Sequence, residues 1–422
     1  MRTITLLTLA VLVGTALLQC SHSTDDAAAK ANAAIDPPRT TANLTASETS
    51  LLNSSNRFGF KLFREIAASG AAGENIFISP LSASYALAMC YNAAAGETRE
   101  EIASTLELAG LTPEDINESY LSLTSLLLNL DPAVEVNIAN SLWYREGLAV
   151  KQEYIDLERT YFDAVVRGLD FNKDWAADTI NAWVKAETRG KIDKIVKKPI
   201  MPDAVAYLIN AIYFKGDWTL SFDTATTAPG PFYLADGSTV MVELMSCDTT
   251  QSYFKNDLFQ AVDLPYGDGQ FAMTILLPRE GKTTGDILAE MSDANWAQWM
   301  GGFQEQPVPL YLPKFRLSYE VTLNQMLQAM GMLAAFAPGR ADFANMVPSE
   351  GLYISTVKQK SFVQVDEQGT EAAAVTAVEF ITVVADPELT MRVDHPFIFA
   401  VRERVSGTVL FIGLIAEPVW ES

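Results

Sequence analysis

The stretch that most constrains the fold is residues 361–384, because a strand pattern continues there past the point at which it should end. Residues 361–365 alternate as a strand does, and the polar residues Asp366, Glu367 and Gln368 then lead to Gly369. Residues 370–384 contain no proline, no glycine and no turn sequence. Such a composition promotes aggregation when it is exposed, so proteins seldom leave a segment of this kind outside a sheet.

Sorting residues 370–384 with a period of two separates two faces. Both glutamates, Glu371 and Glu379, fall on the same face. The opposite face is uncharged and consists of Thr370, Ala372, Ala374, Thr376, Val378, Phe380 and Thr382. This pattern is typical of a strand with one buried and one solvated side. A permanent strand or an alanine-rich helix explains the same composition without any function.

The rest of the chain predicts one large α+β domain. Of the 422 residues 49% are hydrophobic and 19% are charged, and neither a linker nor an internal repeat follows residue 50, so a single large core is expected. Helical patterns dominate the first half and strand patterns the second, which favours large antiparallel or mixed sheets. Helices are expected from residue 56 onward and over 81–90, 97–106, 113–130, 152–161 and 176–188, and strands over 134–144, 204–214, 271–277, 307–312 and 409–415.

The charge balance disfavours polyanionic partners. Lys and Arg number 30 against 52 Asp and Glu, which gives a net charge of −22, and the acidic residues are spread along the chain. Residues 112–131 carry no Lys or Arg. We therefore expect neither nucleic acid nor glycosaminoglycan to bind.

Few residues are available for metal or nucleophilic chemistry. The two histidines are His22 and His395, and no CxxC or HExxH spacing occurs, so neither a metal site nor any other cofactor is expected. His395 precedes Pro396 and an apolar strand, which favours a structural role over a place in a catalytic triad. Residues 252–255 match the SxxK pattern of penicillin-interacting enzymes, but their two aromatic side chains indicate a strand, and no SDN or KTG companion occurs. The chain is not expected to be an enzyme.

The N-terminus predicts export. Arg2 precedes an apolar run, residues 4–18, which is too short to span a membrane, so residues 1–20 are interpreted as a signal peptide. Residues 17–20 resemble a bacterial lipobox in which Cys20 is lipidated, although Gln19 departs from the usual small residue. Secretion after plain signal cleavage is the alternative. Residues 21–54 lack apolar periodicity and are predicted to be a flexible tether before a domain at 55–422.

Two cysteines remain if Cys20 is lipidated. Cys90 lies in an apolar helical stretch, where a buried and inert thiol is expected. A disulfide between Cys90 and Cys247 is the less favoured alternative.

Several motifs from about residue 55 to the C-terminus resemble the serpin family of protease inhibitors. Residues 367–376, EQGTEAAAVT, are similar to the hinge that begins the reactive loop of inhibitory members, and further matches are residues 75–82, 210–218, 263–266, 312–315, 394–397 and 411–418. The resemblance implies the serpin fold, with a large mixed central sheet, further sheets, about eight to nine helices and an exposed reactive loop. Its implied hinge residues are Glu367, Gly369, Thr370, Glu371, Ala372, Ala373, Ala374 and Thr376.

The resemblance also implies a mechanism. A serine protease cuts the loop and becomes attached as an acyl-enzyme, and the loop then inserts into the central sheet and traps it. Counting from the hinge places the reactive bond at Val383–Val384, whereas a shorter-looped relative would place it at Ala385–Asp386. A valine or alanine before the cut suits elastase-like or subtilisin-like proteases, and no Lys or Arg lies between residues 370 and 391. A monomer is expected.

Four further residues match family positions that control sheet opening: Trp218, Ser79, Asn210 and Gln359. Gln359 stands where many relatives have a histidine, so its hydrogen bonding is expected not to change with pH near neutrality. The alternative within the family is a non-inhibitory serpin that acts as a carrier or chaperone. Its hinge would have bulky, charged or proline residues on the inserting face, and none occurs from Thr370 to Thr382.

Overall fold

A computed structural model describes residues 43–70, 73–348, 351–370 and 389–421, which belong to one compact unit, Thr40–Ser422. The predicted signal peptide, Cys20 and most of the predicted tether lie outside these residues. The same holds for five hinge positions, Glu371, Ala372, Ala373, Ala374 and Thr376, and for the predicted reactive bond Val383–Val384.

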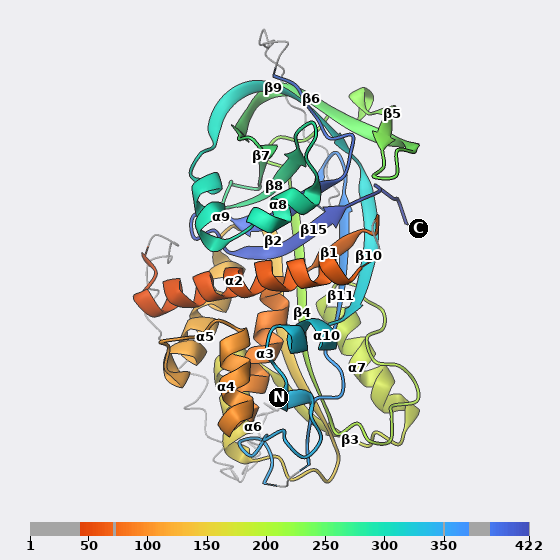
Figure 1. The fold of residues 1–422 in the computed structure, drawn as a ribbon. Coiled ribbons are helices and arrows are strands. Elements are labelled where there is room, and N and C mark those ends of the chain that lie inside the picture. The colour runs from red at the N-terminus through yellow and green to blue at the C-terminus, as the bar shows by residue number, and fades with distance from the viewer. Residues whose placement is uncertain (1–42, 71–72, 349–350, 371–388, 422) are drawn as a thin grey trace, which may run out of the picture. The chain divides into compact units, whose positions relative to one another are not determined.

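Two sheets organise the domain (Figure 1). The six-stranded sheet has the order β10-β11-β12-β4-β2-β3, with β10 Phe315–Thr322, β11 Lys358–Val365, β12 Gly369–Thr370, β4 Ala206–Asp217, β2 Val134–Arg145 and β3 Val165–Leu169. Among the described strands of this sheet, only β2 and β3 run parallel to each other. The predicted large mixed sheet is therefore confirmed.

The nine-stranded sheet has the order β1-β15-β14-β8-β7-β6-β9-β13, and β5 pairs with β6. Its strands are β1 Ile76–Ile78, β5 Ala228–Tyr233, β6 Thr239–Lys255, β7 Phe259–Tyr266, β8 Phe271–Pro278, β9 Gln304–Pro313, β13 Met391–Arg392, β14 Phe397–Glu403 and β15 Val409–Ile415. Strands β8, β14 and β15 are buried almost throughout, which explains their near-continuous apolar sequences.

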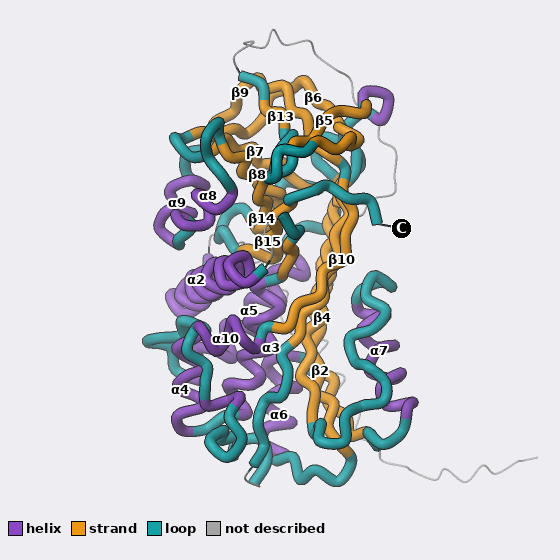
Figure 2. Tube along the Cα trace, turned by 45° about the vertical axis from the view of Figure 1, so that its right-hand side comes forward, coloured by secondary structure: helices purple, strands orange, loops and turns teal. Residues whose placement is uncertain are grey.

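Nine α-helices lie in the described part of the chain, in agreement with the predicted number. They are α2 Ala46–Ser69, α3 Pro80–Ala93, α4 Gly96–Thr105, α5 Pro113–Asn129, α6 Gln152–Phe162, α7 Asp174–Glu187, α8 Thr284–Glu290, α9 Asp293–Met300 and α10 Asn324–Ala329. Figure 2 shows α2 to α6 on one side of the six-stranded sheet and α7 on the other. Ser79 caps α3 and Pro80 occupies its first turn, as the sequence predicts.

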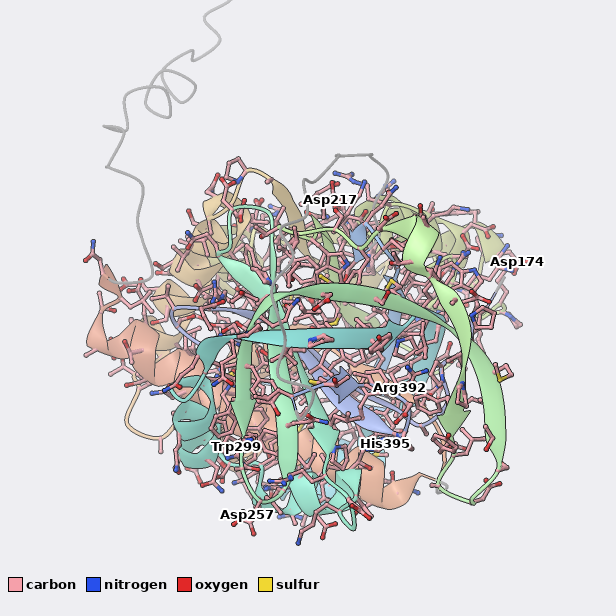
Figure 3. The ribbon with its side chains drawn as sticks, turned by 90° about the horizontal axis from the view of Figure 1, so that it is seen from above. Asp174, Asp217, Asp257, Trp299, Arg392 and His395 are labelled. Carbon is pink, nitrogen blue, oxygen red and sulfur yellow. The ribbon has the colours of Figure 1, made fainter. Side chains whose placement is uncertain are left out.

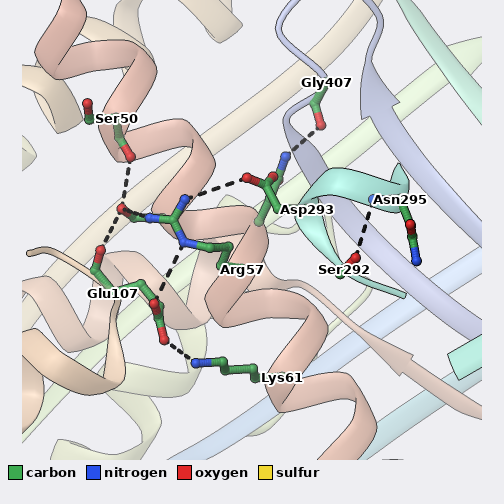
Figure 4. A network of polar contacts seen from close by, with 10 residues as sticks. Ser50, Arg57, Lys61, Glu107, Ser292, Asp293, Asn295 and Gly407 are labelled. Atoms are coloured by element: carbon green, nitrogen blue, oxygen red, sulfur yellow. Dashed lines mark hydrogen bonds and ion pairs between the residues drawn. The ribbon is translucent and has the colours of Figure 1, made fainter. Parts of the chain in front are cut away.

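The first helix begins earlier than the sequence predicts. Helix α2 starts at Ala46 because Thr45 and Glu48 form a capping box, so the predicted tether cannot extend to residue 54 and the predicted domain start at 55 is too late. The pattern is hidden because polar residues in the middle of the helix are buried. The Ser54 hydroxyl donates to the carbonyl of Glu107, and the Asn56 amide donates to the carbonyl of Gly407. Figure 4 shows the two accepting residues, Glu107 and Gly407, beside this helix.

The two cysteines in the described residues are free and buried, so the alternative of a disulfide between Cys90 and Cys247 is wrong. Burial, with the nearby carboxyl of Glu158, raises the pKa of the Cys90 thiol to about 12. The SxxK sequence lies within strand β6, as its aromatic residues predict. The described residues contain no group of side chains suited to hold a metal ion.

Candidate functional site

The candidate functional site includes β12, a two-residue strand that lies between β11 and β4. Thr370 pairs with Val365 on one side and with Gly216 on the other, and Gly369 pairs with Asp217. The backbones approach so closely that a Cβ atom on Gly369 would lie 2.2 Å from the carbonyl oxygen of Gly216. Only glycine fits at this position.

The turn before β12 is held by the end of β4. The backbone N–H of Trp218 donates to the carbonyl of Gln368 (2.7 Å), and its indole N–H donates to the carbonyl of Asp366 (2.9 Å). The Trp218 ring stacks on Tyr266 with 4.5 Å between the ring centroids. The Tyr266 hydroxyl lies 2.5 Å from the hydroxyl of Thr370, so Trp218 and Tyr266 together fix both ends of the turn.

The Glu367 carboxylate fixes the same turn from its other side. It forms an ion pair with Lys314 (2.8 Å) and accepts a hydrogen bond from Thr227 (2.8 Å). Burial raises the pKa of Glu367, but the hydrogen bonds from Lys314, from its own backbone and from Thr227 outweigh this effect and lower it. Glu367 is therefore ionised at neutral pH.

Past Thr370, the described residues place no strand between β4 and β11. Strands β4 and β11 flank β12, yet these two described strands share no backbone ladder with each other. A small cavity lies beside Thr370, between residues 212–214 and 362–363. A larger cavity of about 500 Å³ continues between residues 204–212 and 351–361. Within the part of the chain that the structure describes, a strand, β12, thus occupies only one end of the slot between β4 and β11.

Beside the slot, Ser79, the N-cap of helix α3, contacts Gln359 on β11. The Gln359 amide accepts from the backbone N–H of Ser79 (3.1 Å) and donates to the Ser79 carbonyl (2.7 Å), while the Ser79 hydroxyl donates to the carbonyl of Leu410 (2.6 Å). The uncharged Gln359 amide thus makes two hydrogen bonds to the backbone of Ser79. These two residues, both singled out from the sequence, therefore lie in contact.

Asn210 lies across the slot on β4. Its side-chain N–H donates to Asn140 (2.8 Å), which in turn donates to the carbonyl of Phe162 (2.8 Å). The Asn210 side-chain oxygen is buried and has no hydrogen-bond partner among the described residues. Both Asn210 and Gln359 line the large cavity, but they do not bond to each other.

His395 lies outside the slot, next to Arg392 in Figure 3. One ring nitrogen is 2.9 Å from a carboxylate oxygen of Asp394 and the other is 2.9 Å from the carbonyl oxygen of Pro278. Burial lowers the pKa of His395, but these two acceptors outweigh it and raise the pKa. Both nitrogens are engaged, which agrees with the predicted structural role.

Sequence reasoning did not identify Tyr266, Lys314 and Thr227 as parts of this site. Tyr266 and Lys314 lie in motifs that carry the serpin resemblance, residues 263–266 and 312–315, so these motifs held the signal. Thr227 lies in no such motif.

Comparison with known proteins gives the family. The model of the family described as "Serpin (serine protease inhibitor)" matches residues 53–418. An uncharacterized serpin-like protein of Thermococcus kodakarensis is 35% identical, with 88% of this chain and 86% of the relative covered. Human serpin B11 is 32% identical, with 87% and 100% covered.

Solved structures agree with this result. The thermophilic serpin tengpin in its native state matches with a TM-score of 0.80 at 30% identity, with 90% of this chain and 97% of tengpin covered. Human thyroxine-binding globulin in complex with thyroxine also matches with a TM-score of 0.80, at 27% identity, with 89% of this chain and 100% of that chain covered. The open six-stranded sheet and the turn before β12 agree with these matches, and the chain belongs to the serpin family.

Proposed function

We propose that this serpin is a suicide-substrate inhibitor of serine proteases with small apolar pockets, of the elastase-like or subtilisin-like kind. The protease cuts the loop, becomes trapped as an acyl-enzyme, and the loop inserts between β4 and β11. The observation that carries the proposal is the start of a strand, Gly369–Thr370, at one end of an otherwise open slot.

The slot offers the free energy that trapping requires. The facing edges of β4 and β11 present backbone groups that an inserted strand would pair with. About a dozen new hydrogen bonds at roughly 1 kcal/mol net each would contribute on the order of 10 kcal/mol. Deacylation of the trapped enzyme slows tenfold for each ~1.4 kcal/mol by which its preorganised site is disrupted, so a gain of this size is sufficient.

Polar groups in the slot suit an entering strand. The unpartnered oxygen of Asn210 is an acceptor that an inserted N–H or hydroxyl group would satisfy. The alternation of residues 370–382 sends only uncharged side chains to the face of Thr370, while Glu371 and Glu379 stay on the other. With Val383–Val384 as the reactive bond, an elastase-like or subtilisin-like target is preferred over a trypsin-like one.

A carrier function is the second candidate, because one of the similar structures is thyroxine-binding globulin with bound thyroxine. The uncharged hinge face argues against it, since such a face is not needed in a protein that never inserts its loop. The two functions differ in what a protease leaves behind.

The experiment is incubation with elastase followed by denaturing electrophoresis. We expect a covalent band at the summed mass, whereas a carrier leaves only fragments. Thr370→Arg should turn the inhibitor into a plain substrate, because a charged side chain cannot take the buried place of Thr370 beside Tyr266 and would displace β12, from which insertion continues. Glu371→Arg is the matched control and should still form the complex, since residue 371 alternates to the other face. Complex formation by Thr370→Arg would refute insertion.

We also propose that the protein is exported as a monomer and held at the cell envelope through a lipid on Cys20. The apolar run at residues 4–18 and the lipobox-like residues 17–20 support this, and secretion without an anchor is the alternative. No helix in the described part of the chain is both long and apolar enough to span a bilayer. The mass of the mature N-terminal peptide distinguishes the two routes.

A further inference from the structure

One side of the domain is basic, although the chain as a whole is acidic. Residues 185–198 hold six Lys and Arg against two carboxylates, whereas the whole chain has 30 against 52. After the end of α7, Ile192, Val196 and Ile200 are buried in a small core with residues of that helix. The lysines that lie between these apolar positions are therefore left at the surface.

The outer side of β10 and β11 continues this basic surface. Side chains alternate across a strand, so Lys358, Lys360 and Phe362 of β11 lie on one side of the sheet and the buried residues between them on the other. The Arg316 guanidinium of β10 and the Lys191 ammonium both lie over the Phe362 ring, 5.6 Å and 5.0 Å from its centroid. The segment after α7 and the outer side of β10 and β11 are therefore one continuous surface.

Two carboxylates lie among these basic residues. Asp193 pairs with Lys185 at 2.8 Å, and Glu320 of β10 pairs with Lys358 at 2.7 Å. The pKa of each carboxyl is lowered, first by the hydrogen bond from its paired lysine and then by the charges of further lysines. These further lysines are Lys194 and Lys360 beside Asp193, and Lys197 and Lys360 beside Glu320. Five lysines thus surround two carboxylates.

Positive charge exceeds negative charge on this surface, which we call the basic face. The basic face consists of Lys185, Lys191, Lys194, Lys197, Arg316, Lys358 and Lys360, together with Asp193 and Glu320. These residues leave five positive charges in excess. Arg189 and Lys198 are not counted, because each pairs with a carboxylate outside the face. Charges beyond roughly 8 Å are screened at physiological ionic strength, so a surface in contact with the basic face responds to it and not to the acidic rest of the chain.

We propose that the basic face docks on a membrane surface that carries anionic, phosphate-bearing lipid head groups. A bilayer is flat and meets one side of the domain only, whereas a flexible polyanion would also reach the acidic residues around that side. Each Lys or Arg near an anionic bilayer strengthens binding by about fivefold, so the excess charge of the face is sufficient for reversible binding.

This docking requires neither the inhibitor function nor a lipid on Cys20. Where the proposed lipid is present, it would bring the chain to the bilayer, and the basic face would decide which side of the domain turns towards it.

Sedimentation with lipid vesicles tests the basic face. The protein to use is the unlipidated chain of residues 21–422, which keeps the whole compact unit Thr40–Ser422. It should bind vesicles of phosphatidylcholine that contain about one third phosphatidylglycerol, and it should be released as the salt concentration rises. It should not bind vesicles of phosphatidylcholine alone.

A pair of charge reversals assigns the binding to this face. Lys194→Glu/Lys197→Glu should lose at least about tenfold in affinity for the anionic vesicles, because two charges of the basic face change sign. The matched control is Lys255→Glu/Lys282→Glu, which changes the net charge by the same amount at two exposed lysines outside the face. This control should bind like the wild type.

Chemical acetylation of lysines gives a second readout that needs no variant. On anionic vesicles, Lys194 and Lys360 should be acetylated more slowly than in solution, while Lys255 and Lys282 should react as before, as peptide mass spectrometry measures. Equal binding to vesicles without phosphatidylglycerol, or an equal loss in both double variants, would overturn the docking. Binding to heparin without binding to anionic vesicles would also reject the membrane and assign the face to a polyanionic chain.

Discussion

Two single residues, Gln359 beside the slot and His395 outside it, differ in whether their hydrogen bonds depend on a proton that titrates near neutrality. Gln359 bonds twice to the Ser79 backbone without a proton that titrates near neutrality. His395, by contrast, lies between two acceptors, the Asp394 carboxylate and the Pro278 carbonyl, which only the doubly protonated ring can serve together. Among the described residues, the histidine whose protonation can change near neutrality is therefore His395, which lies outside the slot.

We expect thermal stability to decrease as the pH rises from 6 to 8. The pKa of His395 is raised in the folded state, so its contribution is present below the unfolded value near 6.5 and is lost as the pH passes the folded pKa. The effect should stay below about 1 kcal/mol because the side chain is partly exposed. Melting curves of the wild type and His395→Gln check this, and the variant should show a flat profile over the same range.

A pH-dependent transition that persists in His395→Gln would contradict this assignment. If it disappeared only in a variant of Gln359, the prediction that the contact between β11 and α3 is insensitive to pH would also be wrong.

Among the elements, β12 is one of the two shortest strands, and it depends on its neighbours. Its two residues are held by β11, by β4 and by a turn that Trp218 and Glu367 anchor. The strand exists because Gly369 lets two backbones approach, and its end is marked by the Thr370 contact with Tyr266. This short strand fixes the register from which any longer insertion would continue.

Replacing Gly369 with alanine should displace β12. The new Cβ atom would meet backbone atoms of Gly216 and Asp217, which cannot move as a flexible side chain could. We expect a loss of about 1–3 kcal/mol in unfolding free energy, measured by denaturant titration. Gly285→Ala in α8 is the control, because its Cβ would have only an ordinary contact at 3.4 Å, and it should change stability by less than about 0.5 kcal/mol. Equal stability of the two variants would show that the close approach is not required.

The sequence predicted periodic elements well and buried polar contacts poorly. Strand β15 begins and ends where its apolar run does, and α5 differs from its predicted range by one residue. Helix α2 was predicted to start too late because Ser54 and Asn56 interrupt its apolar pattern while bonding to distant carbonyls.

Within the candidate site, the hinge was recognised by its resemblance to a family, and its partners were not. Lys314 lies 53 residues from Glu367, and Tyr266 lies 104 residues from Thr370. No local period or spacing encodes such pairs, because the sheet alone brings them together. The open slot exists because β4 and β11 do not pair with each other, and no sequence pattern within either strand predicts this.

At the scale of the whole molecule, the open slot means that β4 and β11 lack a backbone hydrogen-bond ladder between them in the described residues. The backbone edges of β4 and β11 face each other across a cavity instead of a ladder. A strand that filled the slot would complete the six-stranded sheet.

Cutting the chain near Val383 should therefore raise the melting temperature. Insertion worth on the order of 10 kcal/mol corresponds to roughly 10–20 °C for a domain of this size. Differential scanning calorimetry before and after limited cleavage measures the change, and Thr370→Arg cut in the same way should gain much less. An unchanged melting temperature in the cut wild type would exclude stored free energy, and the inhibitor proposal would fail with it.

The position of the last strands has a consequence for the fragments. Strands β14 and β15 lie between β1 and β8, which come from earlier parts of the chain. After a break at Val383–Val384, the C-terminal piece would still be enclosed on both edges by the larger piece. The two polypeptides should therefore elute together in gel filtration and separate only in denaturant. A measurement of native size would not distinguish the cleaved protein from the intact one.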